Sequence, residues 1–203
     1  FESDNDVDFG YQYGENARFR VNFLRNQYGP ACVMRLIPTN IKSIEDLNLP
    51  RVMYDIGQIE RGLVLVTGPT GSGKSTTLAA LVDYINSTKS KHIITIEDPI
   101  EFVHKNKKSI IVQREVGTNA LTFNTALRGA MRADPDIVLV GELRDQETIS
   151  LALTCAAMGM LVFAVTVIIT YLRELIHRQI RFAENEQTEQ FSAEIIKTLV
   201  AAI

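Results

Sequence analysis

Tryptophan is absent from this chain of 203 residues, and cysteine is nearly absent, with two residues in all. Cys32 and Cys155 lie far apart and match neither a CxxC pair nor a metal-ligand spacing. This pattern excludes a disulfide framework and a cysteine-based metal site. We expect two buried thiols in a protein of a reducing compartment.

An excess of positive charge is also lacking, since the formal net charge is -3. Such a chain has no basic field to attract nucleic acid, although a local cluster of lysines is present at Lys105, Lys107 and Lys108. We therefore expect no nucleic-acid partner. Because 46% of the residues are hydrophobic and 22% charged, the composition is typical of a globular protein that buries one core.

The first residues do not form a secretory signal, because residues 1–8 carry four acidic side chains where a basic and then apolar run would be needed. This favours a cytoplasmic location. Residues 151–172 are uncharged and long enough to cross a bilayer. However, Gly159 and Met160 divide the segment, so we predict a buried helix followed by a buried strand rather than a membrane span.

The N-terminal part has the pattern of β-structure. Residues 18–23 alternate polar and apolar side chains, and Gly29-Pro30 leads into a second strand over residues 32–37, which predicts a β-hairpin. The sequence from Ser43 to Asp46 then has the form of a capping box and predicts a short helix that ends at Leu49-Pro50. We place the domain junction after these elements, with one domain over residues 1–57 and a second over 58–203.

The second domain alternates strands and helices. Residues 63–66, 93–96 and 137–140 are apolar at every position, and helices are predicted to begin near Lys74, Thr122 and Asp145. Strands of this kind are buried on both faces, and helical crossovers between them imply a mainly parallel sheet. The predicted fold class is α/β, and ligands of such sheets bind beyond the carboxyl ends of the strands.

A phosphate-binding loop stands directly after the first of these strands and before a helix. Its glycines allow backbone N–H groups to face phosphates, its lysine reaches the β- and γ-phosphates, and the hydroxyl of Ser75 binds Mg²⁺. A match in this strand-to-helix context is rarely accidental. The predicted nucleotide-binding residues are Gly68, Pro69, Thr70, Gly71, Ser72, Gly73, Lys74, Ser75 and Thr76.

Acidic residues follow two other strands. Glu142 comes just after residues 137–140 and is the first candidate to orient or deprotonate the attacking water, while Arg144 pairs locally or senses the γ-phosphate. The group Glu97, Asp98 and Glu101 follows residues 93–96, where its carboxylates can hold Mg²⁺ or water. Simpler roles are a helix cap for Glu142 and a plain turn for Asp98-Pro99.

Four segments together resemble the type IV pilus retraction ATPases (PilT-type motors) of the secretion ATPase superfamily. Residues 62–75 are similar to that family's Walker A segment, and residues 95–104 to its Asp box. Residues 113–117 and 134–145 extend the match, the latter being similar to an atypical Walker B segment in which Glu142 would be the catalytic glutamate. The resemblance covers residues 8–164, and its motifs are closer to retraction motors than to extension motors.

The resemblance implies a RecA-like core preceded by part of a small PAS-like α+β domain. It also implies an ATP- and Mg²⁺-dependent homo-oligomer, a hexameric ring, that lies at the cytoplasmic side of the inner membrane without inserting. Inner-membrane pilus platform proteins would be its partners. Arginines of the N-terminal domain contact phosphates in such motors, and Arg18 and Arg20 are the candidates here.

The chain departs from the family after Ala164. A His box of the type Gly-Thr-Leu-His-Thr is expected next, but Val167 stands where the histidine would lie, and His177 is ten residues further on in a predicted helix. Residues 165–181 are replaced without a change in length. The family's C-terminal helical domain is also expected to be missing beyond Ile203.

Three functions therefore remain open. The first is an ATP-hydrolysing motor for pilus retraction and twitching motility. The second is a nucleotide-binding, hydrolysis-poor subunit with a regulatory or structural role in a mixed ring, which the absent His box favours. The third is a related type II/IV secretion-system ATPase.

Overall fold

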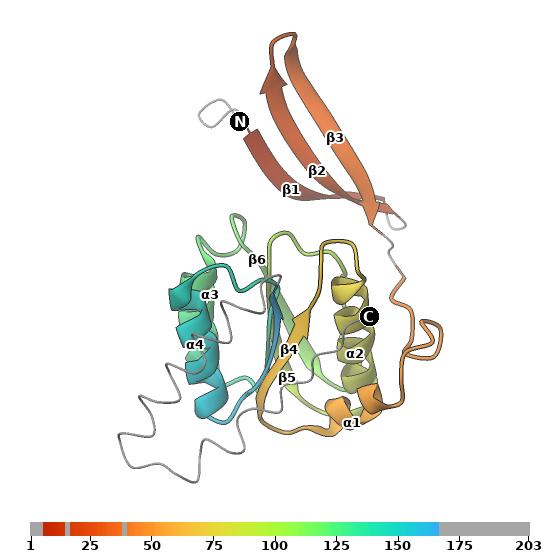
Figure 1. Cartoon of the computed structure of the whole chain (residues 1–203), viewed down its shortest axis with the longest axis vertical. Helices are drawn as coiled ribbons and strands as arrows, with labels where there is room; N and C mark the ends of the chain where they lie inside the picture. The colour runs from red at the N-terminus through yellow and green to blue at the C-terminus, as the bar shows by residue number, and fades with distance from the viewer. Residues whose placement is uncertain (1–5, 15–16, 38–39, 167–203) are drawn as a thin grey trace.

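The computed structural model describes residues 6–14, 17–37 and 40–166, which form two sheets and four helices (Figure 1). An antiparallel sheet of three strands, in the order β1-β2-β3, comes first in the chain. A parallel sheet of five strands follows, in the order β4-β8-β7-β5-β6. The predicted α/β class with a mainly parallel sheet is confirmed.

The antiparallel sheet contains the predicted hairpin. Its strands are β1 (Asp6–Tyr13), β2 (Ala17–Asn26) and β3 (Gly29–Ile37). On one face, Phe9 of β1 stacks on Phe23 of β2 with 6.2 Å between ring centroids. Strand β1 was not predicted, although residues 6–11 alternate in the same way as β2.

One cysteine prediction is wrong. Cys155 is fully buried on the core-facing side of α4, but Cys32 is exposed. Cys32 lies on β3 opposite Phe23, at a position where no helix covers the three-stranded sheet (Figure 1). An apolar residue type on a strand is buried only where a second layer packs on that face.

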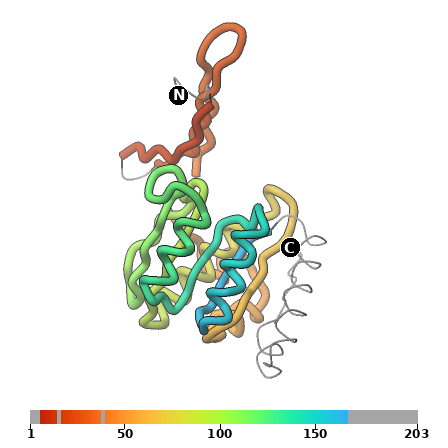
Figure 2. Tube along the Cα trace, turned by 90° about the vertical axis from the view of Figure 1, so that its left-hand side faces the viewer, coloured from red at the N-terminus to blue at the C-terminus, as the bar shows by residue number. Residues whose placement is uncertain are grey.

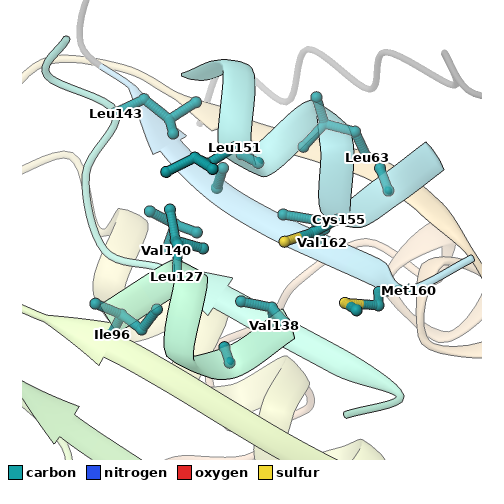
Figure 3. Close-up of a cluster of buried hydrophobic side chains, with 14 of the residues drawn as sticks. Leu63, Ile96, Leu127, Val138, Val140, Leu143, Leu151, Cys155, Met160 and Val162 are labelled. Atoms are coloured by element: carbon teal, nitrogen blue, oxygen red, sulfur yellow. The ribbon is translucent and has the colours of Figure 1, made fainter. Parts of the chain in front are cut away.

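The parallel sheet is covered on both faces. Its strands are β4 (Gly62–Thr67), β5 (His92–Glu97), β6 (Ile110–Glu115), β7 (Ile137–Val140) and β8 (Leu161–Thr166). Because successive side chains point to opposite faces, Leu63 and Val138 pack toward α3 and α4, whereas Val64 and Leu139 pack toward α1 and α2. Figure 3 shows the first of these two clusters.

Three of the four helices that the structure describes, α2, α3 and α4, begin where the sequence predicts. The four are α1 (Val52–Gln58), α2 (Lys74–Thr88), α3 (Phe123–Met131) and α4 (Gln146–Ala157). Thr122 caps α3 through a capping box with Thr125, and Asp145 caps α4 by accepting a hydrogen bond from the backbone N–H of Thr148 at 2.8 Å.

The short helix predicted after Ser43 does not form. Ser43 and Asp46 do make the reciprocal capping bonds, with Asp46 N to Ser43 Oγ at 3.0 Å and Ser43 N to Asp46 Oδ2 at 3.1 Å. The chain then turns because Asn48 adopts a left-handed conformation (φ 51°), which ends the single turn. Helix α1 forms instead within the segment 50–60 and packs on α2.

The uncharged segment that begins at Leu151 contains two elements, as predicted. Helix α4 ends at Ala157 and β8 begins at Leu161, and β8 is buried at every position. Among the residues that the structure describes, no helix is long and apolar enough to span a membrane.

Phe163 provides a test of this packing. It is 0% exposed at the centre of β8, between β4 and β7. We expect Phe163→Ala to lower the free energy of unfolding by about 3 to 5 kcal/mol, because the surrounding strands cannot close the cavity. Urea unfolding measures this, with Leu121→Ala as the control, since Leu121 is 86% exposed. Equal effects of the two substitutions would contradict the buried position of Phe163.

Candidate functional site

Three strands of the parallel sheet end at one edge and carry the predicted chemical residues. The phosphate-binding loop connects β4 to α2, Glu97 is the last residue of β5, and Glu142 follows the end of β7 by two residues. In parallel strands all carboxyl ends lie at the same edge. The topology thus gathers these groups although they are far apart in the sequence.

The loop has the backbone that phosphate binding requires. Gly73, the residue before α2, has φ 91°, a conformation that side chains other than glycine rarely adopt. Lys74 begins α2, and its ammonium donates to the carbonyl oxygens of Gly68 at 2.9 Å and Pro69 at 2.8 Å. The lysine therefore lies over the loop, at the position from which it can reach a phosphate, and Ser75 and Thr76 follow in the first turn of α2.

Arg144 joins the two acidic groups. Its Nε donates to Glu142 Oε2 at 2.7 Å, and its Nη1 donates to Asp98 Oδ2 at 3.2 Å. The hydrogen bond to Glu142 raises the pKa of Arg144 above its ordinary value, so the guanidinium stays charged. One cation thus bridges residues that come after two different strands.

Gly141 explains how Glu142 comes so near to the Asp box. Its N–H donates to the carbonyl oxygen of Ile96 at 2.8 Å, and a Cβ at this position would lie 3.1 Å from that oxygen. A side chain here would force the ends of β7 and β5 apart. Glycine therefore permits the close approach on which the Arg144 bridge depends.

Glu97 is half-buried at the end of β5. Its Oε1 accepts hydrogen bonds from the Thr95 hydroxyl at 2.6 Å and from Gln113 Nε2 at 3.3 Å, and the backbone N–H of Glu101 also donates to its carboxylate. Burial raises the pKa of Glu97, and the hydrogen bonds from Thr95 and Gln113 oppose that rise. Glu97 can therefore hold a proton more readily than an exposed glutamate.

A small cavity of about 40 Å³ lies between α2 and the strand ends. It is lined by Ser75, Glu97 and His104, among others, so the predicted Mg²⁺ ligand and Glu97 line one cavity. The sequence alone assigned no individual role to His104 or Gln113. The side-chain oxygen of Gln113 accepts a hydrogen bond from the backbone N–H of His104 at 2.8 Å. Both residues belong to the segments that resemble the family, 95–104 and 113–117, and this was the signal in the sequence that pointed to them.

His104 has a buried nitrogen without a partner. In the part of the chain that the structure describes, its Nδ1 is a buried side-chain atom that has no hydrogen-bond partner. Burial lowers the pKa of His104 to about 4. The imidazole is therefore neutral at pH 7.

The two N-terminal arginines lie at different places. Arg18 contacts the Asp box, with its Nε donating to Ile100 O at 3.1 Å, and its Nη2 lies 3.4 Å from Glu115 Oε2 on β6. Arg20 lies 4.0 Å from Asp8 on the neighbouring strand. Strands β4 and β6 are the two outer strands of the sheet. Arg18, which contacts β6, is therefore next to the Asp box and not next to the phosphate-binding loop.

Two residues of the departure from the family, Val167 and His177, lie outside the described residues. The described chain ends at Thr166, which pairs with Thr67 immediately before the phosphate-binding loop. The departure therefore begins on the strand beside this loop.

Comparison with known proteins agrees with this arrangement. The family model described as "Type II/IV secretion system protein" matches residues 3–196. Over 163 residues, which are 80% of this chain, it is 55% identical to a Neisseria gonorrhoeae "Twitching motility protein" and to a Pseudomonas aeruginosa "Type IV pilus retractation ATPase PilT", covering 44% and 47% of them.

A solved structure is similar as well. The crystal structure of the pilus retraction motor PilT with bound ADP superposes with a TM-score of 0.81 at 46% identity, over 87% of this chain and 52% of that one. The chain spans about half the length of the curated relatives it matches.

The pKa of His104 leads to a prediction about stability. The unfolded chain, with an ordinary histidine pKa near 6.5, binds a proton between about pH 6.5 and pH 4 that the folded chain does not bind. The contribution of His104 to the free energy of unfolding is therefore fully present above about pH 6.5 and is lost as the pH falls toward 4.

The unfolding free energy should fall between pH 7 and pH 5 in the unsubstituted chain. We expect this fall to be smaller by roughly 1 to 2 kcal/mol in His104→Gln. Urea unfolding at the two pH values measures it. His92→Gln is the matched control at another histidine. An unchanged pH dependence in the His104 variant would show that this imidazole titrates normally in the folded protein.

Proposed function

Because the chain belongs to the type II/IV secretion system protein family, we propose that it is the nucleotide-binding part of an ATP-hydrolysing motor that drives type IV pilus retraction. The observation that carries this proposal is the convergence of Lys74, Glu97 and Glu142 at one edge of the parallel sheet. The similarity to proteins named for twitching motility and pilus retraction supports the choice of motor.

In this proposal the phosphate-binding loop, Gly68 to Thr76, holds ATP, and Lys74 leaves its own loop carbonyls for the β- and γ-phosphates. Ser75 would ligate Mg²⁺, which supplies charge neutralisation at the phosphates. Ser75 and Glu97 line the same cavity, which supports a metal site beside the phosphates.

Glu142 would orient or deprotonate the attacking water. In the structure described here its carboxylate is paired with Arg144, so hydrolysis requires Arg144 to loosen that bond or to move with it toward the γ-phosphate. Asp98, which also pairs with Arg144, would hold the arginine during that movement. Glu97 and Glu101 would complete the Asp box.

The assembly and location follow from the same proposal. We place the chain in a hexameric homo-oligomer at the cytoplasmic face of the inner membrane, where pilus platform proteins would be its partners. We place the domain boundary as predicted, with the N-terminal domain over residues 1–57 and the core over 58–203. Arg20 stays a candidate for phosphate contact in such an assembly, whereas Arg18 is held at the Asp box by Ile100 and Glu115.

The second candidate, a subunit that binds nucleotide but hydrolyses it poorly, is favoured by one specific observation. Val165 and Thr166 of β8 lie beside β4 at the point where the sequence leaves the family pattern, and Val165 lines the cavity with Ser75. The altered segment is thus adjacent to the proposed chemistry. The two candidates predict equal nucleotide binding and different turnover.

Two substitutions separate binding from hydrolysis. We expect Lys74→Ala to weaken Mg·ATP binding at least tenfold, because it removes the phosphate-facing cation. We expect Glu142→Gln to leave binding nearly unchanged and to reduce turnover by about 100-fold or more, because an amide cannot accept the proton. Binding of a fluorescent ATP analogue and phosphate release measure the two effects.

Glu147→Gln is the matched control, since Glu147 is an exposed residue of α4 that pairs with Arg128. If the unsubstituted chain binds Mg·ATP but turns it over no faster than Glu142→Gln, the motor proposal fails for this chain and the hydrolysis-poor subunit is supported.

A further inference from the structure

Arg18 crosses from the antiparallel sheet to the nucleotide-binding core. It is on β2, and its guanidinium contacts two residues more than 80 positions away in the chain: Ile100 O at 3.1 Å and Glu115 Oε2 at 3.4 Å. Both ends of the ion pair are largely buried, with side-chain exposures of 15% for Arg18 and 9% for Glu115. In a pair so shielded from water, loss of one partner leaves the other charge buried and unpaired, which is costly.

Glu115 binds the backbone of Ile100 as well. Its Oε2, which faces Arg18, also accepts the backbone N–H of Ile100 at 3.0 Å, while its Oε1 accepts the Thr118 hydroxyl at 3.1 Å. The C=O of Ile100 is therefore bound by Arg18 and its N–H by Glu115. One residue of the Asp box is fixed through both of its backbone polar groups by one ion pair.

Gly10 lies directly beside this ion pair. It lies on β1, and a Cβ there would be 2.5 Å from Arg18 Nη2 and 3.3 Å from Glu115 Oε2. Its backbone is ordinary strand, so glycine is not needed for its conformation. The missing side chain makes room for the guanidinium between the two sheets.

Ile100 is close in the chain to the groups that the proposed hydrolysis uses. Asp98, two residues before it, pairs with Arg144, and Arg144 pairs with Glu142. Glu101, the next residue, donates its backbone N–H to Glu97. A shift of Ile100 therefore moves both sides of the candidate site, whereas the phosphate-binding loop follows β4, which is three strands away from β5 in the sheet.

We propose that Arg18, Glu115 and Gly10 form a clamp that fixes the Asp box and couples the position of the antiparallel sheet to hydrolysis. Arg18 and Glu115 are positioning residues, since they act through Ile100 and not on the nucleotide. Figure 2 shows the sheet standing over the loops at this end of the core. Movement of the sheet withdraws Arg18 from Ile100, and the Asp box then loses its fixed geometry.

The inference rests on the proposed function for its effect on turnover, but its structural part is measured separately. Hydrogen exchange of the backbone amides over residues 98–104 reports how firmly the Asp box is held. Thermal unfolding of each variant shows that it is folded. The measurements use the full chain, with and without Mg·ATP.

We expect Gly10→Ala, Arg18→Gln and Glu115→Gln each to speed exchange of the Ile100 amide about tenfold or more. The same variants should lower kcat at least about tenfold while the Kd for Mg·ATP changes by less than about threefold, because misplacement of the Asp box affects the chemistry and not the phosphate-binding loop. If the ion pair only stabilised the fold, the variants would unfold more easily but would not lose kcat while keeping their Kd for Mg·ATP.

Matched controls are available in the same sheet. Gln12→Ala, on β1 beyond Gly10, and Arg35→Gln, an exposed arginine of β3, should leave exchange and turnover unchanged. Arg18→Lys keeps the charge but loses the planar fork, so it should recover only part of the turnover. Full recovery with lysine would contradict the clamp geometry.

The outcomes for the clamp and for the proposed function are distinguishable. Unchanged exchange over residues 98–104 in Gly10→Ala and Glu115→Gln overturns the clamp, whatever the turnover. Faster exchange in a chain whose unsubstituted form has no turnover supports the clamp as a structural coupling and rejects the motor function.

Discussion

Parallel pairing of β4, β8, β7 and β5 is the constraint on which the rest of this structure depends. The pairing aligns Thr67 with Thr166 and Val140 with Ile96, so the chain leaves neighbouring strands at nearly the same height. A slip by one residue would turn the apolar faces away from their helices. The two hydrophobic layers therefore fix the register, and the register brings the loop, Glu97 and Glu142 together.

Charge at the carboxyl ends of the strands is arranged around the exposed cation of Arg144 and the half-buried carboxylate of Glu97. Arg144 neutralises Glu142 and Asp98 in a network, which holds their positions better than an isolated surface pair would. Glu97 instead accepts hydrogen bonds from Thr95 and Gln113, and desolvation raises its pKa.

Much of the fold could be predicted because the local signals were strong. The uniformly apolar strands, the glycine-rich loop and the caps at Thr122 and Asp145 each involve neighbouring residues and appear in the structure as predicted. Strand β6 was missed because it is an edge strand, in which Ile110 is exposed and Ile111 buried, so it lacks the continuous apolar run of the central strands.

Long-range contacts could not be predicted from the sequence in the same way. The position of Arg18 against Ile100 depends on how the antiparallel sheet stands on the core, and no local pattern near Arg18 specifies this. The same is true of the orphaned Nδ1 of His104, which depends on packing between the Asp box and α2. The capping bonds at Ser43 show the reverse case, since a correct local signal was ended after one turn by Asn48.

The central claim is that the sheet edge forms one site for a nucleotide, with Glu142 facing the γ-phosphate. A crystal structure with Mg²⁺ and a non-hydrolysable ATP analogue tests it most directly. The account predicts that Lys74 Nζ has left the carbonyls of Gly68 and Pro69 for the β- and γ-phosphates, and that Glu142 is one water molecule away from the γ-phosphate. A nucleotide bound elsewhere, or a Glu142 carboxylate that points away from the γ-phosphate, would contradict it.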